Sequence, residues 1–314
     1  MVPEDRTGAD LLLMRELQEV VGGEFNRHLR TAKEWMPHEY VEWSAGRNFP
    51  ALFEDGQAWA PEQSKLTSLG RAALILNLLT EDNLPSYHYE IASMFGRDHA
   101  WGAWVHRWTA EEARHSIVIR DYLLTSRAID PERLERLRMT HVSTGYVSEN
   151  RHSFLHLTAY LTLQELATRI AHRYVGEYCG DPICERILVR VAMDENLHMV
   201  FYRNVLAAAL DLDPDATVQA LRDVATTFRM PGHEMPGFSR AAAQMAIGGV
   251  YNLRIHHDEV VQPVLRYLKV LDIGGLTARG LQAQQELGEY MDELNMRARD
   301  FDDKLVARKA RLAR

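Results

Sequence analysis

Apolar residues recur along most of this chain at intervals of three and four positions, and sustained two-residue alternation is absent. Intervals of three and four place apolar side chains on one face of an α-helix, whereas alternation is typical of strands. The predicted helices cover residues 10–29, 65–94, 98–126, 151–178, 183–208, 239–246 and 255–269, with further ones starting at Pro131, Asp213 and Thr277. We therefore expect an all-α fold.

Proline and glycine mark the breaks between these helices. Residues 35–62 contain three prolines and two glycines, and they are predicted to form an ordered crossing loop. Residues 230–237 contain two prolines and two glycines, and they break the helical pattern again. Pro85 lies inside the predicted helix 65–94, where it cannot donate a hydrogen bond to the Glu81 carbonyl. A kink is therefore expected there.

The chain has 314 residues, 46% of them hydrophobic, which is ample for a large core. No segment reads as a linker, so we expect a single domain, residues 1–314, with a bundle core at about 65–210 and C-terminal helices at about 213–314. The net charge of -8 argues against nucleic acid as a partner. The longest apolar run, residues 72–79, is far shorter than the ~20 residues of a membrane span.

The N-terminus and the cysteines bear on the cellular compartment. Residues 1–6 contain no apolar signal core. The two cysteines, Cys179 and Cys184, match neither a metal-binding CxxC nor a disulfide framework. Both observations favour a reducing, cytoplasmic location.

One motif occurs twice on the predicted helices. Glu112 to His115 and Glu195 to His198 both read E-x-x-H, and each is preceded by a lone glutamate, 31 residues earlier in the first copy and 30 in the second. Residues three apart share one face of a helix. Two such pairs plus one glutamate from each of two further helices form the inward-facing ligand set of a di-iron carboxylate bundle. The candidate metal ligands are Glu81, Glu112, His115, Glu165, Glu195 and His198.

Each candidate ligand interrupts an apolar stripe of its helix. Trp108 precedes Glu112 and Ile119 follows His115 on one such stripe, which predicts burial of both ligands. Buried carboxylates are costly, and four of them together repel one another unless cations or protons compensate. A third E-x-x-H, at residues 149–152, lies in a polar segment and interrupts no stripe, so we regard it as chance.

The ligand chemistry favours iron. Oxygen-rich sites with one imidazole per metal suit iron or manganese, whereas zinc sites are usually tetrahedral with fewer carboxylates. Two iron ions are the preferred interpretation, and manganese or a mixed pair stays open.

Four segments resemble the soluble acyl-[acyl-carrier-protein] desaturases, and most of all their actinobacterial branch. These segments are residues 80–87, 108–115, 164–168 and 194–198, and the resemblance extends over roughly residues 10 to 270. The resemblance implies a ferritin-like four-helix bundle with additional helices. It also implies that the six candidate ligands hold two irons, with Glu112 and Glu195 bridging or nearly so, and with Glu81 and Glu165 terminal.

The resemblance also implies a reaction and its partners. An enzyme of this family uses O2 and two electrons from a ferredoxin-type donor to introduce a cis double bond into a fatty acyl chain held on acyl carrier protein. A homodimer is implied as well. Candidate lining for an acyl channel comes from large apolar side chains, although core packing is the favoured role for any one of them: Trp101, Trp104, Met193, Met199, Phe201 and Tyr202.

Three further residues gain a role from the resemblance. Thr168 would lie beside the oxygen site and help to handle protons, although a helical threonine can also simply bond back to a carbonyl. Asp194 would bond His115 or Trp35 and form an electron-entry route. The alternatives are a surface aspartate and an ordinary core tryptophan. A basic C-terminal run is a carrier-docking candidate or a solvated face: Lys304, Arg308, Lys309, Arg311 and Arg314.

Other functions share the ligand plan. A di-iron hydroxylase or oxygenase acting on a carrier-bound substrate would use the same oxidant. A ribonucleotide-reductase-like radical protein would place a tyrosine where Ile119 stands, whereas Tyr122 lies two turns from His115. A ferritin would be about half this length, and a metal-free bundle would have to explain four buried glutamates. Plant desaturases also differ at Ala113, Asn196 and Leu197, none of which is a candidate ligand.

Overall fold

The computed structural model describes residues 7–147, 153–233 and 237–312, and these residues form helices, turns and loops without a strand. This confirms the all-α prediction. The third E-x-x-H, at residues 149–152, lies outside the described residues. None of the helices in the described ranges combines the length and apolarity needed to cross a membrane.

The N-terminal segment differs from its prediction in one respect. The single helix expected at 10–29 is two helices, α1 (Gly8–Glu16) and α2 (Gln18–Thr31), separated at Leu17. The crossing loop that follows is confirmed and contains three short 3-10 turns. They are η1 (Pro37–Glu39), η2 (Trp43–Ala45) and η3 (Pro61–Gln63).

The helix predicted at 65–94 does not kink at Pro85 but breaks two residues earlier. It forms α3 (Ser68–Asp82) and α4 (Leu84–Phe95), and Asn83 joins them with φ -82° and ψ 10°. Pro85 lies in the first turn of α4, where a missing N–H has no cost. Glu81 therefore lies in the last turn of α3, next to the break.

Three helices begin with the same Asp-Pro pair. Asp130, Asp181 and Asp213 each accept hydrogen bonds from backbone N–H groups of the first turn, and proline occupies the first helical position. These helices are α6 (Pro131–Thr144), α8 (Pro182–Leu212) and α9 (Pro214–Thr227). Local sequence thus determines where each of them starts.

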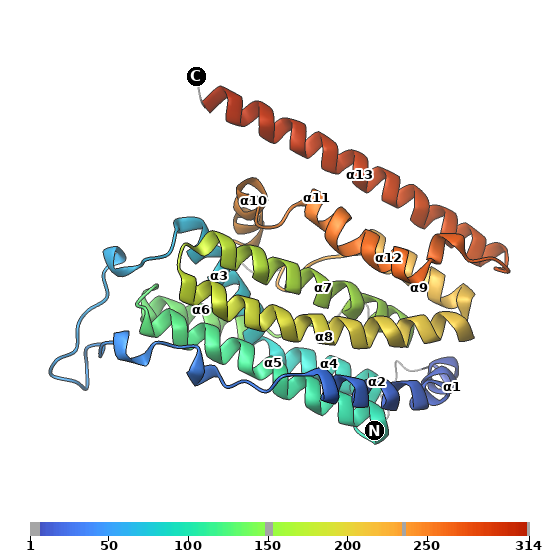
Figure 1. Ribbon diagram of the computed structural model, residues 1–314, viewed down its shortest axis with the longest axis horizontal. Coiled ribbons are helices and arrows are strands. Elements are labelled where there is room, and N and C mark those ends of the chain that lie inside the picture. Colours follow the sequence, from blue (N-terminus) through green and yellow to red (C-terminus); the bar gives the residue numbers. More distant parts are fainter. Residues whose placement is uncertain (1–6, 148–152, 234–236, 313–314) are drawn as a thin grey trace.

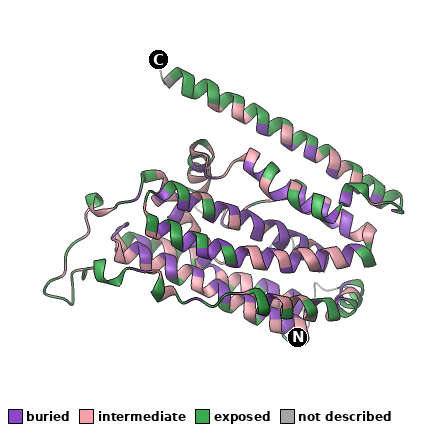
Figure 2. Ribbon diagram, viewed as in Figure 1, coloured by how far each residue is buried: buried purple, intermediate pink, exposed green. Residues whose placement is uncertain are grey.

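Four helices form the bundle core, as the ferritin-like prediction requires. They are α3, α5 (His99–Thr125), α7 (Phe154–Cys179) and α8, and they run along a common axis (Figure 1). α7 is buried over most of its circumference, because neighbouring helices cover it from several sides (Figure 2). The central position of α7 makes it the scaffold around which the others pack.

The C-terminal third lies across one side of this bundle (Figure 1). It contains α10 (Phe238–Gly248), α11 (Leu253–Ile255), a π-helical turn (His256–Val261), α12 (Gln262–Leu268), η5 (Val270–Asp272) and α13 (Ala278–Leu312). One hydrophobic cluster joins side chains of α7, α8, α9, α12 and α13. We therefore propose that the chain forms one domain. The basic C-terminal run is exposed through Arg311, and Arg314 lies outside the described residues.

Candidate metal centre

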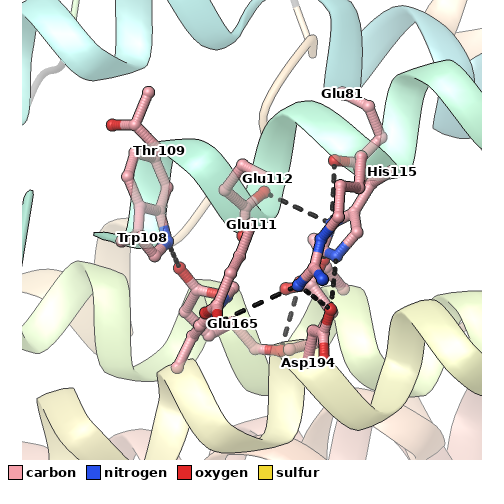
Figure 3. A network of polar contacts seen from close by, with 12 residues as sticks. Glu81, Trp108, Thr109, Glu111, Glu112, His115, Glu165 and Asp194 are labelled. Carbon is pink, nitrogen blue, oxygen red and sulfur yellow. Dashed lines mark hydrogen bonds and ion pairs between the residues drawn. The ribbon is translucent and has the colours of Figure 1, made fainter. Parts of the chain in front are cut away.

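The structure brings all six predicted ligands together inside the bundle. Figure 3 labels Glu81, Glu112, His115 and Glu165 among them. Two groups of four are close enough to hold an ion each, with one ligand atom per residue and these atoms within 4.8 Å of one another. Glu81 and His115 belong to the first group, and Glu165 and His198 to the second. The two remaining glutamates, Glu112 and Glu195, belong to both groups.

The local helix geometry explains this convergence. α5 supplies Glu112 and His115 from adjacent turns of one face, and α8 supplies Glu195 and His198 in the same way. α3 and α7 add one glutamate each. The six side chains are between 0% and 9% exposed, so the burial inferred from the apolar stripes is confirmed.

Both imidazoles direct Nδ1 toward the carboxylates. His115 Nδ1 lies 3.4 Å from Glu195 Oε1 and 3.5 Å from Glu81 Oε2, and His198 Nδ1 lies 2.8 Å from Glu112 Oε1. Within the described part of the chain, neither Nδ1 atom makes a hydrogen bond of acceptable geometry, in spite of these short distances. Among the described residues, Glu112 Oε1 and Glu165 Oε2 also lack hydrogen-bond partners. Buried nitrogen and oxygen atoms that lack hydrogen-bond partners and point toward one place indicate a cation site.

Burial and neighbouring charges shift the pKa values of the cluster. Burial and the charge of Glu195 raise the pKa of the Glu165 carboxyl well above its usual range. Burial disfavours the charged form of His115, yet the charge of Glu112 raises the pKa of this imidazole well above its usual range. Protons therefore compensate the carboxylates when no cation is bound. A bound cation would displace them, because metal ligands must be deprotonated.

An outer carboxylate lies behind the first imidazole. Asp194 Oδ2 lies 3.5 Å from His115 Nε2, and it accepts hydrogen bonds from Trp35 Nε1 at 2.8 Å and Arg114 Nη2 at 3.0 Å. Arg190 binds the other oxygen of Asp194. Asp194 is 2% exposed, so the alternative of a surface aspartate is wrong. The electron-entry role of Asp194 and Trp35 stays a prediction.

The second imidazole has a matching outer carboxylate, which the sequence analysis missed. Glu111 Oε2 lies 3.0 Å from His198 Nε2 and 2.9 Å from His28 Nε2. Arg107 Nε donates to Glu111 Oε1 at 2.6 Å. The sequence did carry a signal for Glu111, because an acid precedes the first glutamate of both E-x-x-H motifs. No sequence signal identifies His28, which is 83 residues away from Glu111.

Two other contacts with ligand carboxylates were also missed. His172 Nε2 lies 2.9 Å from Glu81 Oε1, and Asn77 Nδ2 lies 3.0 Å from the other ring nitrogen. Trp108 Nε1 donates to Glu165 Oε1 at 3.0 Å. These contacts leave fewer orientations open to the two glutamates predicted to be terminal ligands.

The Thr168 hydroxyl bonds back to its own helix and also contacts a candidate ligand. Its hydroxyl lies 3.1 Å from the Gln164 carbonyl and 2.9 Å from Glu195 Oε2. A hydroxyl that bonds a buried carboxylate can hold or pass a proton there. The geometry is compatible with the predicted catalytic role, which stays a prediction.

Two cavities meet beside the cluster. The larger, about 470 Å³, lies between α3, α7, α10 and residues 229–233, and the smaller, about 40 Å³, lies between α4, α5 and α7. Glu81 and Thr168 line both cavities. None of the six apolar side chains expected to line the channel lines either cavity. Trp104, for example, stacks on Phe201 within the core, with 3.5 Å between the ring centroids. Core packing therefore explains the position of Trp104.

Comparison with known proteins gives consistent results. A family model described as fatty acid desaturase matches residues 9–313. Mycobacterium tuberculosis has a protein named "Putative acyl-[acyl-carrier-protein] desaturase DesA1" that is 45% identical over 300 residues, covering 93% of this chain and 88% of that protein. A rice chloroplastic stearoyl-[acyl-carrier-protein] 9-desaturase 5 is 26% identical over 88% of this chain and 73% of its own length.

A solved structure is also similar. The structure titled "X-ray structure of putative acyl-ACP desaturase DesA2 from Mycobacterium tuberculosis H37Rv" superimposes with a TM-score of 0.70 at 25% sequence identity. The match covers 87% of this chain and 99% of that one.

Proposed function

The chain belongs to the fatty acid desaturase family, and on this premise we propose that it is an acyl-acyl-carrier-protein desaturase. The proposed reaction introduces a cis double bond into a carrier-bound fatty acyl chain, with O2 as oxidant and two electrons from a ferredoxin-type donor. The observation that carries the proposal is the buried cluster of four glutamates and two histidines, whose unpartnered atoms converge.

The cluster fits a pair of iron ions. Each group offers three carboxylates and one imidazole, which are the ligands that iron and manganese accept. We propose Glu112 and Glu195 as bridging ligands because both groups share them, and Glu81 and Glu165 as terminal ligands. An unactivated C–H bond offers no acidic proton, so bound metals would activate the O2 that removes its hydrogens, chemistry that protein side chains lack.

The protein contributes positioning and proton handling. The two cavities give an acyl chain room on both sides of Glu81 and Thr168, which would place one methylene pair beside the metals. Thr168 would hold a proton at its hydroxyl next to Glu195. Asp194 would keep His115 oriented and, with Trp35, conduct electrons inward. The ferredoxin-type donor, the homodimer and the cytoplasmic location stay predictions.

Product analysis tests the proposed reaction. The purified protein is loaded with iron and incubated with acyl-carrier substrates, reduced ferredoxin and O2, and the acyl products are analysed by mass spectrometry. Loss of two hydrogens supports desaturation, whereas gain of one oxygen atom would indicate the hydroxylase alternative.

The ligand assignment needs a separate control. Glu112→Ala removes a carboxylate that both groups share, so we expect loss of tight metal binding with retained helical circular dichroism. Full metal content in this variant would refute the assignment. Loss of helicity would call for the milder Glu112→Gln, which keeps the volume and removes the charge.

A further inference from the structure

The C-terminal helix α13 continues past the part of the molecule that supports it. Leu287, Met291 and Leu294 are buried in the hydrophobic cluster that α13 shares with α7, α9 and α12. Among the described residues, the last polar contact of α13 with another element joins Asp302 Oδ2 to Arg254 Nε at 3.1 Å. The end of the helix therefore projects from the bundle (Figure 1), and Figure 2 shows most of this end as exposed.

The projecting end of α13 carries an apolar stripe that is only partly covered. Phe301 and Leu305 follow the buried Ala298 at intervals of three and four residues, but both are half-buried. Val306, next to Leu305, is 67% exposed. Most helical stability in proteins comes from packing of an apolar face, and a short helical end gains little by itself. The pattern indicates that a further element covers this stripe.

The charges around the stripe form two blocks of opposite sign. Residues 300–303 contain three aspartates and no base, and residues 304–311 contain four basic residues and no acid. A second copy of this helix in antiparallel orientation would place its basic block beside the acidic block. A parallel copy would place like charges together, which disfavours that orientation. The end of α13 is therefore complementary to itself in one orientation.

We propose that the end of α13 binds the end of α13 in a second copy of this chain, as an antiparallel pair whose twofold axis lies at Leu305 and Val306. A twofold contact is isologous, so one patch serves both copies. With the axis there, residues 300–303 of each copy lie beside residues 308–311 of the other, and the apolar side chains meet between them. Because the projecting end is short, the contact is smaller than a standard interface of about 1,600 Å². It links two copies weakly, and added salt weakens it further.

Engineered cysteines test the pairing, because only residues near a twofold axis meet their own counterparts. Val306→Cys places a thiol at the axis, and Met296→Cys places one elsewhere on the same helix, at positions that are 67% and 64% exposed. The two native cysteines are buried. With oxidised glutathione at low salt, we expect a disulfide-linked dimer of Val306→Cys on a non-reducing gel, and at most a trace for Met296→Cys.

A charge exchange tests the orientation. In the proposed register, Asp303 of each copy lies beside Arg308 of the other. Asp303→Lys and Arg308→Glu, each combined with Val306→Cys, should lower the yield of cross-linked dimer roughly threefold to tenfold, because two attractive pairs become two repulsive ones. A mixture of the two variants should restore the yield, since every opposing pair then has opposite charges.

Several outcomes would overturn the proposal. Equal cross-linking of Val306→Cys and Met296→Cys would indicate random collision, and an undiminished yield in both charge variants would contradict the antiparallel register. A dimer in sedimentation without cross-linking at residue 306 would place the contact between copies on other helices. Absence of this cross-link, together with carrier-protein binding that Arg308→Glu abolishes, would assign the basic block to the carrier. None of these measurements needs metal or turnover, so failure of the proposed function would appear separately.

Discussion

At the scale of single residues, the site depends on carboxylates that are not proposed ligands. Asp194 and Glu111 lie behind the two imidazoles and face Nε2, which leaves Nδ1 of His115 and His198 directed at the cluster. Outer carboxylates of this kind fix the tautomer and ring orientation of a metal-binding histidine. The two half-sites nevertheless differ, because an indole anchors one outer carboxylate and the imidazole of His28 anchors the other.

We expect Glu111→Gln to weaken metal binding by roughly tenfold to a hundredfold, as changes behind metal-bound histidines usually do. The loss should affect the ion beside His198, because Glu111 Oε2 holds that imidazole. Competitive metal titration, with spectra of the cobalt-substituted protein, checks both the affinity and the stoichiometry.

Arg107→Gln is the matched control, because Arg107 contacts the other oxygen of Glu111. Its effect on metal affinity should be clearly smaller. Equal effects of the two substitutions would show that Glu111 acts through general charge, and no effect of Glu111→Gln would remove its positioning role.

At the scale of helices, close backbone contact at the end of the bundle positions the ligand helices. Gly70 in α3 lies so near the end of α7 that an added Cβ would be 2.4 Å from the Cys179 Cα. Thr67 strengthens this junction, because its N–H donates to the Cys179 carbonyl at 3.0 Å. Three turns later along α3, Glu81 reaches the cluster at the break before Asn83.

We therefore expect Gly70→Ala to destabilise the protein by about 1–3 kcal/mol, because the helices must move apart. Gly23→Ala is the control, since an added Cβ there has no neighbour within 4 Å and alanine favours a helix. Thermal unfolding should give a lower Tm for the first variant and an unchanged or higher Tm for the second. Equal Tm values for the two variants would contradict the proposed close contact.

At the scale of the whole molecule, folding buries four carboxylates that only protons or cations can compensate. Metal binding to the folded state alone should raise Tm with increasing metal concentration. Glu165→Gln tests this balance, because burial and the charge of Glu195 raise the pKa of Glu165 in the metal-free protein. The variant should be at least as stable as the metal-free wild type near neutral pH, and it should gain less from iron or manganese.

The pH dependence of this difference has a definite sign. A carboxyl whose pKa is raised by folding contributes stability at acidic pH, and that contribution is lost as pH rises above the ordinary value of 4.5. Metal-free wild type should therefore lose stability relative to Glu165→Gln between acidic and neutral pH. Parallel stability curves for the two proteins would contradict the raised pKa.

Much of the architecture was predictable because it depends on local order in the chain. The period of apolar residues predicted the helices, and the starts of α6, α8 and α9 lie at Asp-Pro pairs, which are local features of the chain. The break at Asn83 was expected as a kink at Pro85, because a missing N–H does not reveal whether the helix bends or ends. None of the candidate channel residues lines either cavity, because an apolar stripe looks the same whether it faces the core or a cavity.

By itself the sequence determined which six side chains could meet, because the spacing of E-x-x-H fixes one helix face and burial of a carboxylate demands a compensating charge. Only the tertiary structure decided what surrounds them. His28 faces Glu111 and His172 faces Glu81 because separate segments pack there. Contacts between distant segments depend on how helices pack in space, and no periodicity along the chain encodes them.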